Sequence, residues 1–68
     1  MRRKNLKIFR VKQDLTQSDM ALAIGCSRDA YSAIESGGRD PSYGFMQNLQ
    51  SAFNIPSERM WVLLEREN

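Results

Sequence analysis

Residues 25–30, Gly-Cys-Ser-Arg-Asp-Ala, stand where one short helix must end and another must begin. Gly25 can adopt the positive φ angle that closes a helix, and the side-chain oxygen of Ser27 can cap the start of the next one. Two short helices joined by so tight a turn cross at a steep angle, and the second is left projecting from the body of the protein. Such a helix offers exposed side chains for hydrogen bonding, and its geometry suits entry into the major groove of DNA.

The chain is poorly supplied with catalytic and metal-binding groups. It has no histidine and a single cysteine, Cys26, which leaves no common general base, no disulfide within the chain and no cluster of metal ligands. The acids Asp14, Asp19 and Asp29 are spread over expected helix ends rather than paired at one place. We therefore expect no enzyme activity, no cofactor, no metal and no small-molecule ligand. Cys26 is interpreted as a small buried residue, with a redox switch as the alternative.

Positive charge is concentrated at the start of the chain. The net charge is +2 over 68 residues, but the first twelve residues contain no acid. Their basic residues are Arg2, Arg3, Lys4, Lys7, Arg10 and Lys12. A basic end is typical of a protein that binds a polyanion, and a solvated helix face that only aids solubility is the alternative.

No segment predicts a membrane protein. No apolar run approaches the ~18 residues of a membrane span, and the basic start is not followed by the apolar stretch of a signal peptide. With its single cysteine, the chain is expected in a reducing cytoplasm and without a membrane partner.

The spacing of apolar residues predicts an all-α fold of five short helices. No segment shows the alternation of a strand, and residues 1–68 are expected to form one domain. The expected helices span residues 4–13, 16–24, 27–36, from 41 or 42 to 53, and from 56 or 57 onward. Thr16 and Asp19 predict a capping box, and Asp14 and Asn54 are expected to follow helices in the left-handed conformation. The residues expected to face inward on the fourth helix are Phe45, Met46, Leu49, Ala52 and Phe53.

Together these features resemble the Cro/phage-repressor (XRE-like) family of helix-turn-helix proteins. The similarity spans residues 5–64, with the helix-turn-helix at about residues 16–36. The residues that carry it are Leu15-Thr16-Gln17, Met20-Ala21, Ile24-Gly25, Ser27-Arg28, Tyr31-Ser32, Ile34-Glu35, Gly37, Arg39, Pro41-Ser42 and Ala52-Phe53-Asn54-Ile55. The resemblance implies a lambda-repressor-like DNA-binding domain whose partner is double-stranded DNA.

The resemblance places base contacts on the outward face of the third helix, at Arg28, Asp29, Ser32 and Ala33. The Arg28 guanidinium can donate two hydrogen bonds to guanine, and the Asp29 carboxylate can accept one from cytosine. Asp29 has an alternative role as a first-turn acid that stabilises the helix dipole. Ala33 can offer only an apolar contact, for example to a thymine methyl group.

The resemblance also implies contacts to the DNA phosphates from Gln17, Ser27, Arg39 and Arg10. Gln17 opens the second helix, where donors can meet a phosphate. Arg39 lies in the loop after the third helix, where a solvated charge is the alternative. Arg10 and Glu35 resemble a family pair that ties the first helix to the third, and two independent surface charges are the alternative.

The chain departs from the family pattern after the third helix. Family members often have basic residues just after Glu35 and Gly37, where this chain has Ser36 and Gly38. Over residues 25–44, two arginines stand against three acids. The expected DNA-facing surface is therefore poor in positive charge, and the basic N-terminal residues would have to compensate.

Binding as a dimer is expected because one such domain covers about one half-site. We interpret the chain as a sequence-specific DNA-binding transcriptional regulator, a repressor or autoregulator, that acts as a homodimer on a palindromic operator. The expected interface residues are Ile55, Trp61, Val62 and Leu64, and the alternative is a monomer in which Trp61 folds back over the fourth helix. A second interpretation is a protein-interaction or antitoxin-like module that keeps the fold with weak or no DNA binding.

Overall fold

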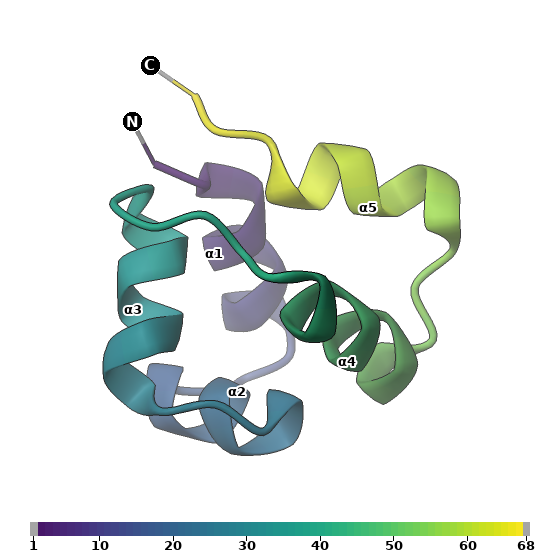
Figure 1. The fold of residues 1–68 in the computed structure, drawn as a ribbon. Helices are drawn as coiled ribbons and strands as arrows, with labels where there is room; N and C mark the ends of the chain where they lie inside the picture. Colours follow the sequence, from purple (N-terminus) through teal and green to yellow (C-terminus); the bar gives the residue numbers. More distant parts are fainter. Residues whose placement is uncertain (1, 68) are drawn as a thin grey trace.

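Each predicted helix is present in the computed structural model, which describes residues 2–67 (Figure 1). The helices are α1 (Lys4–Lys12), α2 (Gln17–Ile24), α3 (Arg28–Ser36), α4 (Tyr43–Phe53) and α5 (Ser57–Leu64). Among residues 2–67 the one β-type pairing is an isolated bridge between Arg2 and Glu67, close to the two chain ends. The all-α prediction is therefore confirmed. No helix in this described range is long and apolar enough to cross a membrane.

The arrangement of the helices places α1 in the middle of the structure. α2 packs against α3 and α4, while α1 packs against α3 and α5. In Figure 1, α5 runs across the top beside both chain ends, and the loop that leads from α3 into α4 crosses in front of α1. The pair formed by α2 and α3 is therefore held by α4, which packs against α2, and by α1, which packs against α3.

The predicted caps explain where α2 and α3 begin and end. The Thr16 hydroxyl accepts a hydrogen bond from the Asp19 N–H at 3.1 Å, and the Asp19 carboxylate accepts one from the Thr16 N–H at 3.0 Å. This capping box confirms the prediction, with aspartate in the place of the more usual glutamate. The Ser27 hydroxyl accepts from an N–H of the first turn of α3 at 3.1 Å. Gly25 and Gly37 close the two helices, each with a φ of 87°.

Two residues other than glycine also adopt the left-handed conformation. Asp14 follows α1 with a φ of 58°, and Asn54 follows α4 with a φ of 52°. Both were predicted to do so, because short polar side chains tolerate this region better than most others. The chain can therefore change direction sharply after α1 and after α4.

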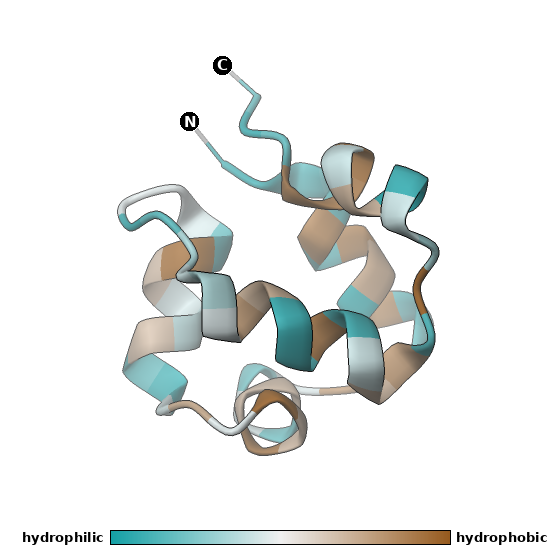
Figure 2. Cartoon of the chain, turned by 45° about the vertical axis from the view of Figure 1, so that its right-hand side comes forward, coloured by the Kyte–Doolittle hydropathy of each residue, from teal (hydrophilic) through white to brown (hydrophobic). Residues whose placement is uncertain are grey.

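One hydrophobic core lies between the helices, and Figure 2 shows hydrophobic bands on each of them, whereas the chain ends and the loop after α3 are hydrophilic or neutral. The core residues are Leu6, Met20, Ala21, Ile24, Tyr31, Ile34, Phe45, Leu49, Ile55 and Leu63. Ala52, which was expected to face inward, is exposed. The last turn of α4 packs through Phe53 instead, whose ring meets Phe9 edge to face with the centroids 5.3 Å apart.

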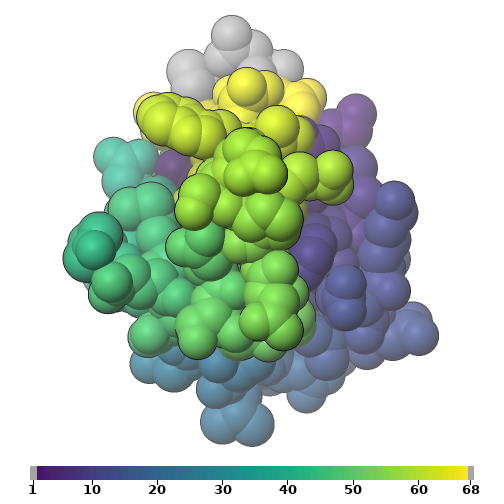
Figure 3. Space-filling model, turned by 90° about the vertical axis from the view of Figure 1, so that its right-hand side faces the viewer, coloured from purple at the N-terminus to yellow at the C-terminus, as the bar shows by residue number. Residues whose placement is uncertain are grey.

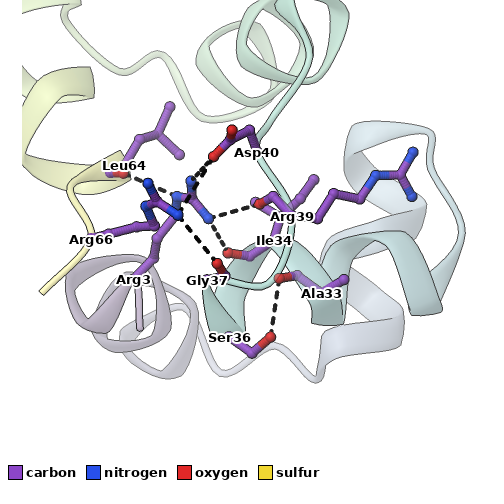
Figure 4. Close-up of polar contacts among 9 residues, drawn as sticks. All are labelled: Arg3, Ala33, Ile34, Ser36, Gly37, Arg39, Asp40, Leu64 and Arg66. Carbon is purple, nitrogen blue, oxygen red and sulfur yellow. Dashed lines mark hydrogen bonds and ion pairs between the residues drawn. The ribbon is translucent and has the colours of Figure 1, made fainter. Parts of the chain in front are cut away.

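Arg3 is buried, although its sequence neighbours predict a solvated basic end. Its side chain is 3% exposed and donates to the carbonyl oxygens of Leu64 at 3.0 Å, Ile34 at 2.6 Å and Arg39 at 2.9 Å (Figure 4). A fourth contact, 3.3 Å long, reaches the Asp40 carboxylate. These acceptors lie in the last turn of α3, at the end of α5 and in the loop that follows α3. A guanidinium can satisfy them together because it has five donors in one plane.

Replacing Arg3 by alanine should destabilise the protein by about 2–3 kcal/mol, because it leaves the partly buried carbonyl oxygens of Leu64 and Arg39 without the donor they have here and removes one of two donors to Ile34. Arg3→Lys should recover only part of this loss, since one ammonium group cannot reach the separate acceptors that lie around the edge of the guanidinium plane. Thermal or urea unfolding would measure both effects. Arg2→Ala is the matched control, because the Arg2 side chain is exposed. An equal effect of the two alanine variants would contradict the role assigned to Arg3.

Candidate nucleic-acid interface

The turn between α2 and α3 is tight enough to set the two helices close together. The N–H groups of Gly25 and Cys26 both donate to the Ala21 carbonyl oxygen, at 2.8 Å and 3.0 Å. Ala21 is 2% exposed and packs in the core beside α3. Cys26 is half-buried in the turn, and this burial raises the pKa of its thiol. Cys26 therefore behaves as a small packing residue, as predicted.

The two sides of α3 differ sharply in burial. Tyr31, Ile34 and Glu35 face the interior. The side chains of Arg28 and Asp29 are 62% and 98% exposed, and they lie 4.0 Å apart at the start of the helix. Ser32 and Ala33 are half-buried on the following turn. All four predicted base-contact residues therefore lie on the side of α3 that the core does not use.

The predicted phosphate contacts lie at the borders of this surface. Gln17 is the first residue of α2, and Ser27 is the exposed residue that caps α3. Arg39 lies in the loop after α3 and is exposed. Figure 4 shows its side chain extending away from the group around Arg3, while its backbone carbonyl faces Arg3. The structure thus exposes Ser27 at a helix start and Arg39 on a loop, where donors are accessible to an anion. Gln17 is half-buried, and its side-chain amide donates one of its two N–H groups to Glu35 at 3.2 Å.

The charge balance of this surface differs from the count made on the sequence. Glu35 is buried and paired with Arg10 at 2.9 Å. Asp40 lies 3.3 Å from Arg3 and 3.9 Å from Arg66, which both come from outside residues 25–44. The negative charges of Glu35 and Asp40 are thus paired with arginines from outside residues 25–44, which the charge count over that segment does not include. Asp29 remains as the exposed acid of α3.

Glu35 joins three helices through four hydrogen bonds. It accepts from Arg10 at 2.9 Å and 3.3 Å, from the Tyr31 hydroxyl at 2.6 Å and from the Gln17 amide at 3.2 Å. The predicted pair of Arg10 and Glu35 is confirmed, and the alternative of independent surface charges is wrong. Tyr31 and Gln17 belong to the same network, which the sequence pattern did not reveal. Tyr31 stands four residues before Glu35 on α3, a spacing that could have indicated the contact, whereas Gln17 is 18 residues away and leaves no local signal.

Arg10 is not available for the phosphate contact expected of it. Its side chain is 12% exposed, and besides its bonds to Glu35 it donates to the Leu15 carbonyl oxygen at 2.8 Å. Every nitrogen of the guanidinium is therefore used inside the protein. The expected phosphate contact of Arg10 is therefore wrong, because its bonds to Glu35 and Leu15 withdraw the guanidinium from the surface.

The four expected interface residues do not share one environment. Ile55 is 8% exposed and belongs to the core, so it is not available to a partner. Leu64 is half-buried against the core. Trp61 and Val62 are 83% and 54% exposed, so the alternative in which Trp61 folds back over α4 is wrong. They belong to α5, which lies across one face of the molecule above α4, with α1 at its edge (Figure 3).

The Glu35 network also determines how this carboxylate titrates. Burial raises the pKa of Glu35, but hydrogen bonds from Arg10, Tyr31 and Gln17 outweigh burial and lower the pKa below its usual 4.5. Burial, together with the bond to Glu35, raises the pKa of the Tyr31 hydroxyl, which stays a donor at neutral pH. Because the folded pKa of Glu35 is lowered, its ionised form stabilises the fold above about pH 4.5.

Glu35→Gln should cost about 3 kcal/mol at neutral pH, because it leaves the guanidinium of Arg10 without its charged partner. The difference in unfolding free energy between parent and variant should shrink as the pH falls from about 4.5 through the lowered pKa of the folded protein. Urea unfolding at several pH values would measure it. A difference that stays constant into acid would contradict an ionised, hydrogen-bonded Glu35.

Comparison with known sequences also indicates a helix-turn-helix protein. Residues 6–59 match the family model described as helix-turn-helix. An uncharacterized HTH-type transcriptional regulator of Bacillus subtilis, YqaE, is 39% identical over 75% of this chain, which spans 44% of that protein. A regulator of the same description from Methanocaldococcus jannaschii, MJ0272, is 34% identical over 91% of this chain and 94% of its own length. One from Archaeoglobus fulgidus is 29% identical, covering 96% of this chain and 92% of its own.

The family match covers the cap, turn and packing residues described above, from Leu6 in the core of α1 to the first turn of α5. It confirms the resemblance on which the sequence interpretation rests. The chain belongs to the helix-turn-helix family, in its Cro/phage-repressor (XRE-like) branch.

Proposed function

We propose that this protein is a sequence-specific DNA-binding transcriptional regulator. The observation that carries the proposal is the outward side of α3. It presents Arg28, Asp29, Ser32 and Ala33 while the opposite side packs into the core. The relatives named as HTH-type transcriptional regulators support the same role.

The side chains of α3 define how a DNA sequence would be read. With α3 in the major groove, Arg28 donates two hydrogen bonds to O6 and N7 of guanine. Asp29 accepts from N4 of cytosine or serves the dipole of α3, and Ala33 can contact a thymine methyl group. Gln17, Ser27 and Arg39 contact phosphates on either side of the groove and fix the position of α3. Specificity then comes from α3, and orientation from the residues around it.

We propose further that the working form is a homodimer on a palindromic operator. One domain covers about one half-site, and specific affinity normally needs two. Trp61 and Val62 provide an apolar surface on α5 that a two-fold contact would cover in each subunit. Such a dimer would set its recognition helices about 34 Å apart, one turn of B-DNA. Bound there, it would act as a repressor or autoregulator by occupying its operator.

Arg28→Ala should weaken binding to a selected DNA site by about 1–3 kcal/mol and relax the preference at one base pair. Arg39→Ala should weaken binding to all duplexes about equally, because phosphates carry no sequence information. Selection from random duplex DNA, followed by affinity measurements on selected and random sites, would separate these effects. Equal losses for Arg28→Ala on both kinds of site would reassign Arg28 to a phosphate. A parent protein that binds no duplex at low salt would favour the protein-interaction module.

Trp61→Ala should weaken self-association, because it removes the largest exposed apolar side chain of α5. Sedimentation of parent and variant, with and without operator DNA, would measure the effect. Leu22→Ala is the matched control, since Leu22 is equally exposed, at 83%, but lies on α2. If the folded Trp61→Ala protein associates as the parent does, α5 is not the interface.

A further inference from the structure

An open groove of about 1030 Å³ runs between α1 and α3. One wall is the outer side of α1, with Lys4, Lys7 and Val11, and the other is α3, with the short side chains of Ser32 and Ser36. Because serines are small, the space between the two helices is not filled. Of the residues that line this groove, the contacts proposed above include only Gln17 and Ser32, at its border with the DNA-facing side of α3.

The α1 wall of the groove carries positive charge that the protein does not use. Lys4, Lys7 and Lys12 all line the groove, and all three are exposed. Within residues 2–67 none of them forms an ion pair, whereas Arg3 and Arg10 are both engaged internally. α1 itself has no acidic residue. Arg2 is likewise exposed, lines the groove and forms no ion pair among the described residues, so the free cations of the N-terminal basic segment are Arg2 and the three lysines of α1.

The acids near the groove do little to neutralise these lysines. Glu35 lies at its floor, but its carboxylate is already held by Arg10, Tyr31 and Gln17. Glu67 is the other acid of the lining. The groove is therefore electrostatically complementary to an anion, with Val11 and Ile8, 55% and 42% exposed, offering apolar contact between the charges.

The groove is continuous with the surface proposed to face DNA. Ser32 belongs both to its lining and to the outward side of α3, and Gln17, a proposed phosphate contact, also lines it. Lys4 and Lys12 are about 12 Å apart along α1, given a helix rise of about 1.5 Å per residue. A DNA strand that follows α1 would bring about three phosphates past this length.

We propose that the groove between α1 and α3 holds one strand of the DNA backbone, with Lys4, Lys7 and Lys12 as phosphate contacts. This inference rests on the proposed DNA-binding function and extends its footprint from α2, α3 and the following loop to α1. The lysines replace the phosphate contacts that Ser36, Gly38 and the internally bound Arg10 do not make. The sugars of the strand lie against Val11 and Ile8, since deoxyribose carries apolar C–H groups.

The test is the salt dependence of binding to a random duplex. Lys7→Gln should reduce the slope of log K against log salt by about 0.9, the value for one lost phosphate contact on B-DNA. Lys4→Gln and Lys12→Gln should act in the same direction, and Lys7→Arg should keep the parent slope. Arg59→Gln is the matched control, because it removes one exposed positive charge from α5, outside this groove.

The salt dependence of the variants distinguishes a DNA strand from other occupants of the groove. A slope for Lys7→Gln equal to that of Arg59→Gln, in a parent that binds DNA, would overturn the inference while leaving the proposed function intact, and would favour an acidic protein segment as the occupant of the groove. A loss confined to one DNA sequence would also overturn it, because phosphate contacts act on every sequence. A parent protein that binds no duplex would remove the proposed function itself. Unchanged thermal unfolding of the variants would show that the lysines act on DNA rather than on the fold.

Discussion

The arrangement of the DNA-facing helices depends on one buried carboxylate. Glu35 lies on the inner side of α3 and accepts hydrogen bonds from Arg10 of α1, Gln17 of α2 and Tyr31 of α3. A buried carboxylate without these donors would be costly, so the three helices must keep the positions in which the donors reach it. Such a network specifies geometry more than it adds stability. It orients Gln17 at the edge of the DNA-facing surface and withdraws Arg10 from that surface.

The basic residues of the N-terminal segment fall into two groups, buried arginines and exposed residues. Arg3 and Arg10 bind the C-terminal part of α3, the loop after it and the loop before α2. Their guanidinium groups are engaged by carbonyl oxygens and carboxylates of the protein. Lys4, Lys7 and Lys12 remain exposed on α1. Side-chain chemistry explains why both buried cations are arginines, because a planar guanidinium can satisfy several fixed acceptors, whereas an ammonium group is strongly hydrated. Arg2 is exposed like the lysines. The residues that hold α3 in place are thus distinct from those proposed to contact DNA.

Much of the fold could be predicted from local sequence signals. Thr16 with Asp19, Gly25, Ser27 and Gly37 act within one or two turns of themselves, so the bounds of α2 and α3 follow from their types. The apolar spacing on α3 likewise predicts which side it buries, and therefore that Arg28 and Asp29 are exposed. Ala52 shows the limit of this reasoning, because burial near a helix end depends on neighbours such as Phe9 and Phe53.

The sequence by itself determined the helices, the turn and the outward side of α3, because caps and apolar periodicity act over a few residues. The Arg10–Glu35 pair was expected from the family resemblance, but only the tertiary structure showed the contacts of Arg3 and Asp40. Arg3 contacts residues 31 to 61 positions away, and no local pattern distinguishes it from the exposed Arg2 and Lys4. The same holds for Asp40, whose charge appears unfavourable for DNA binding in the sequence but is paired with Arg3 and Arg66 in the structure. Electrostatic interactions depend on distance in space, which the chain order does not report.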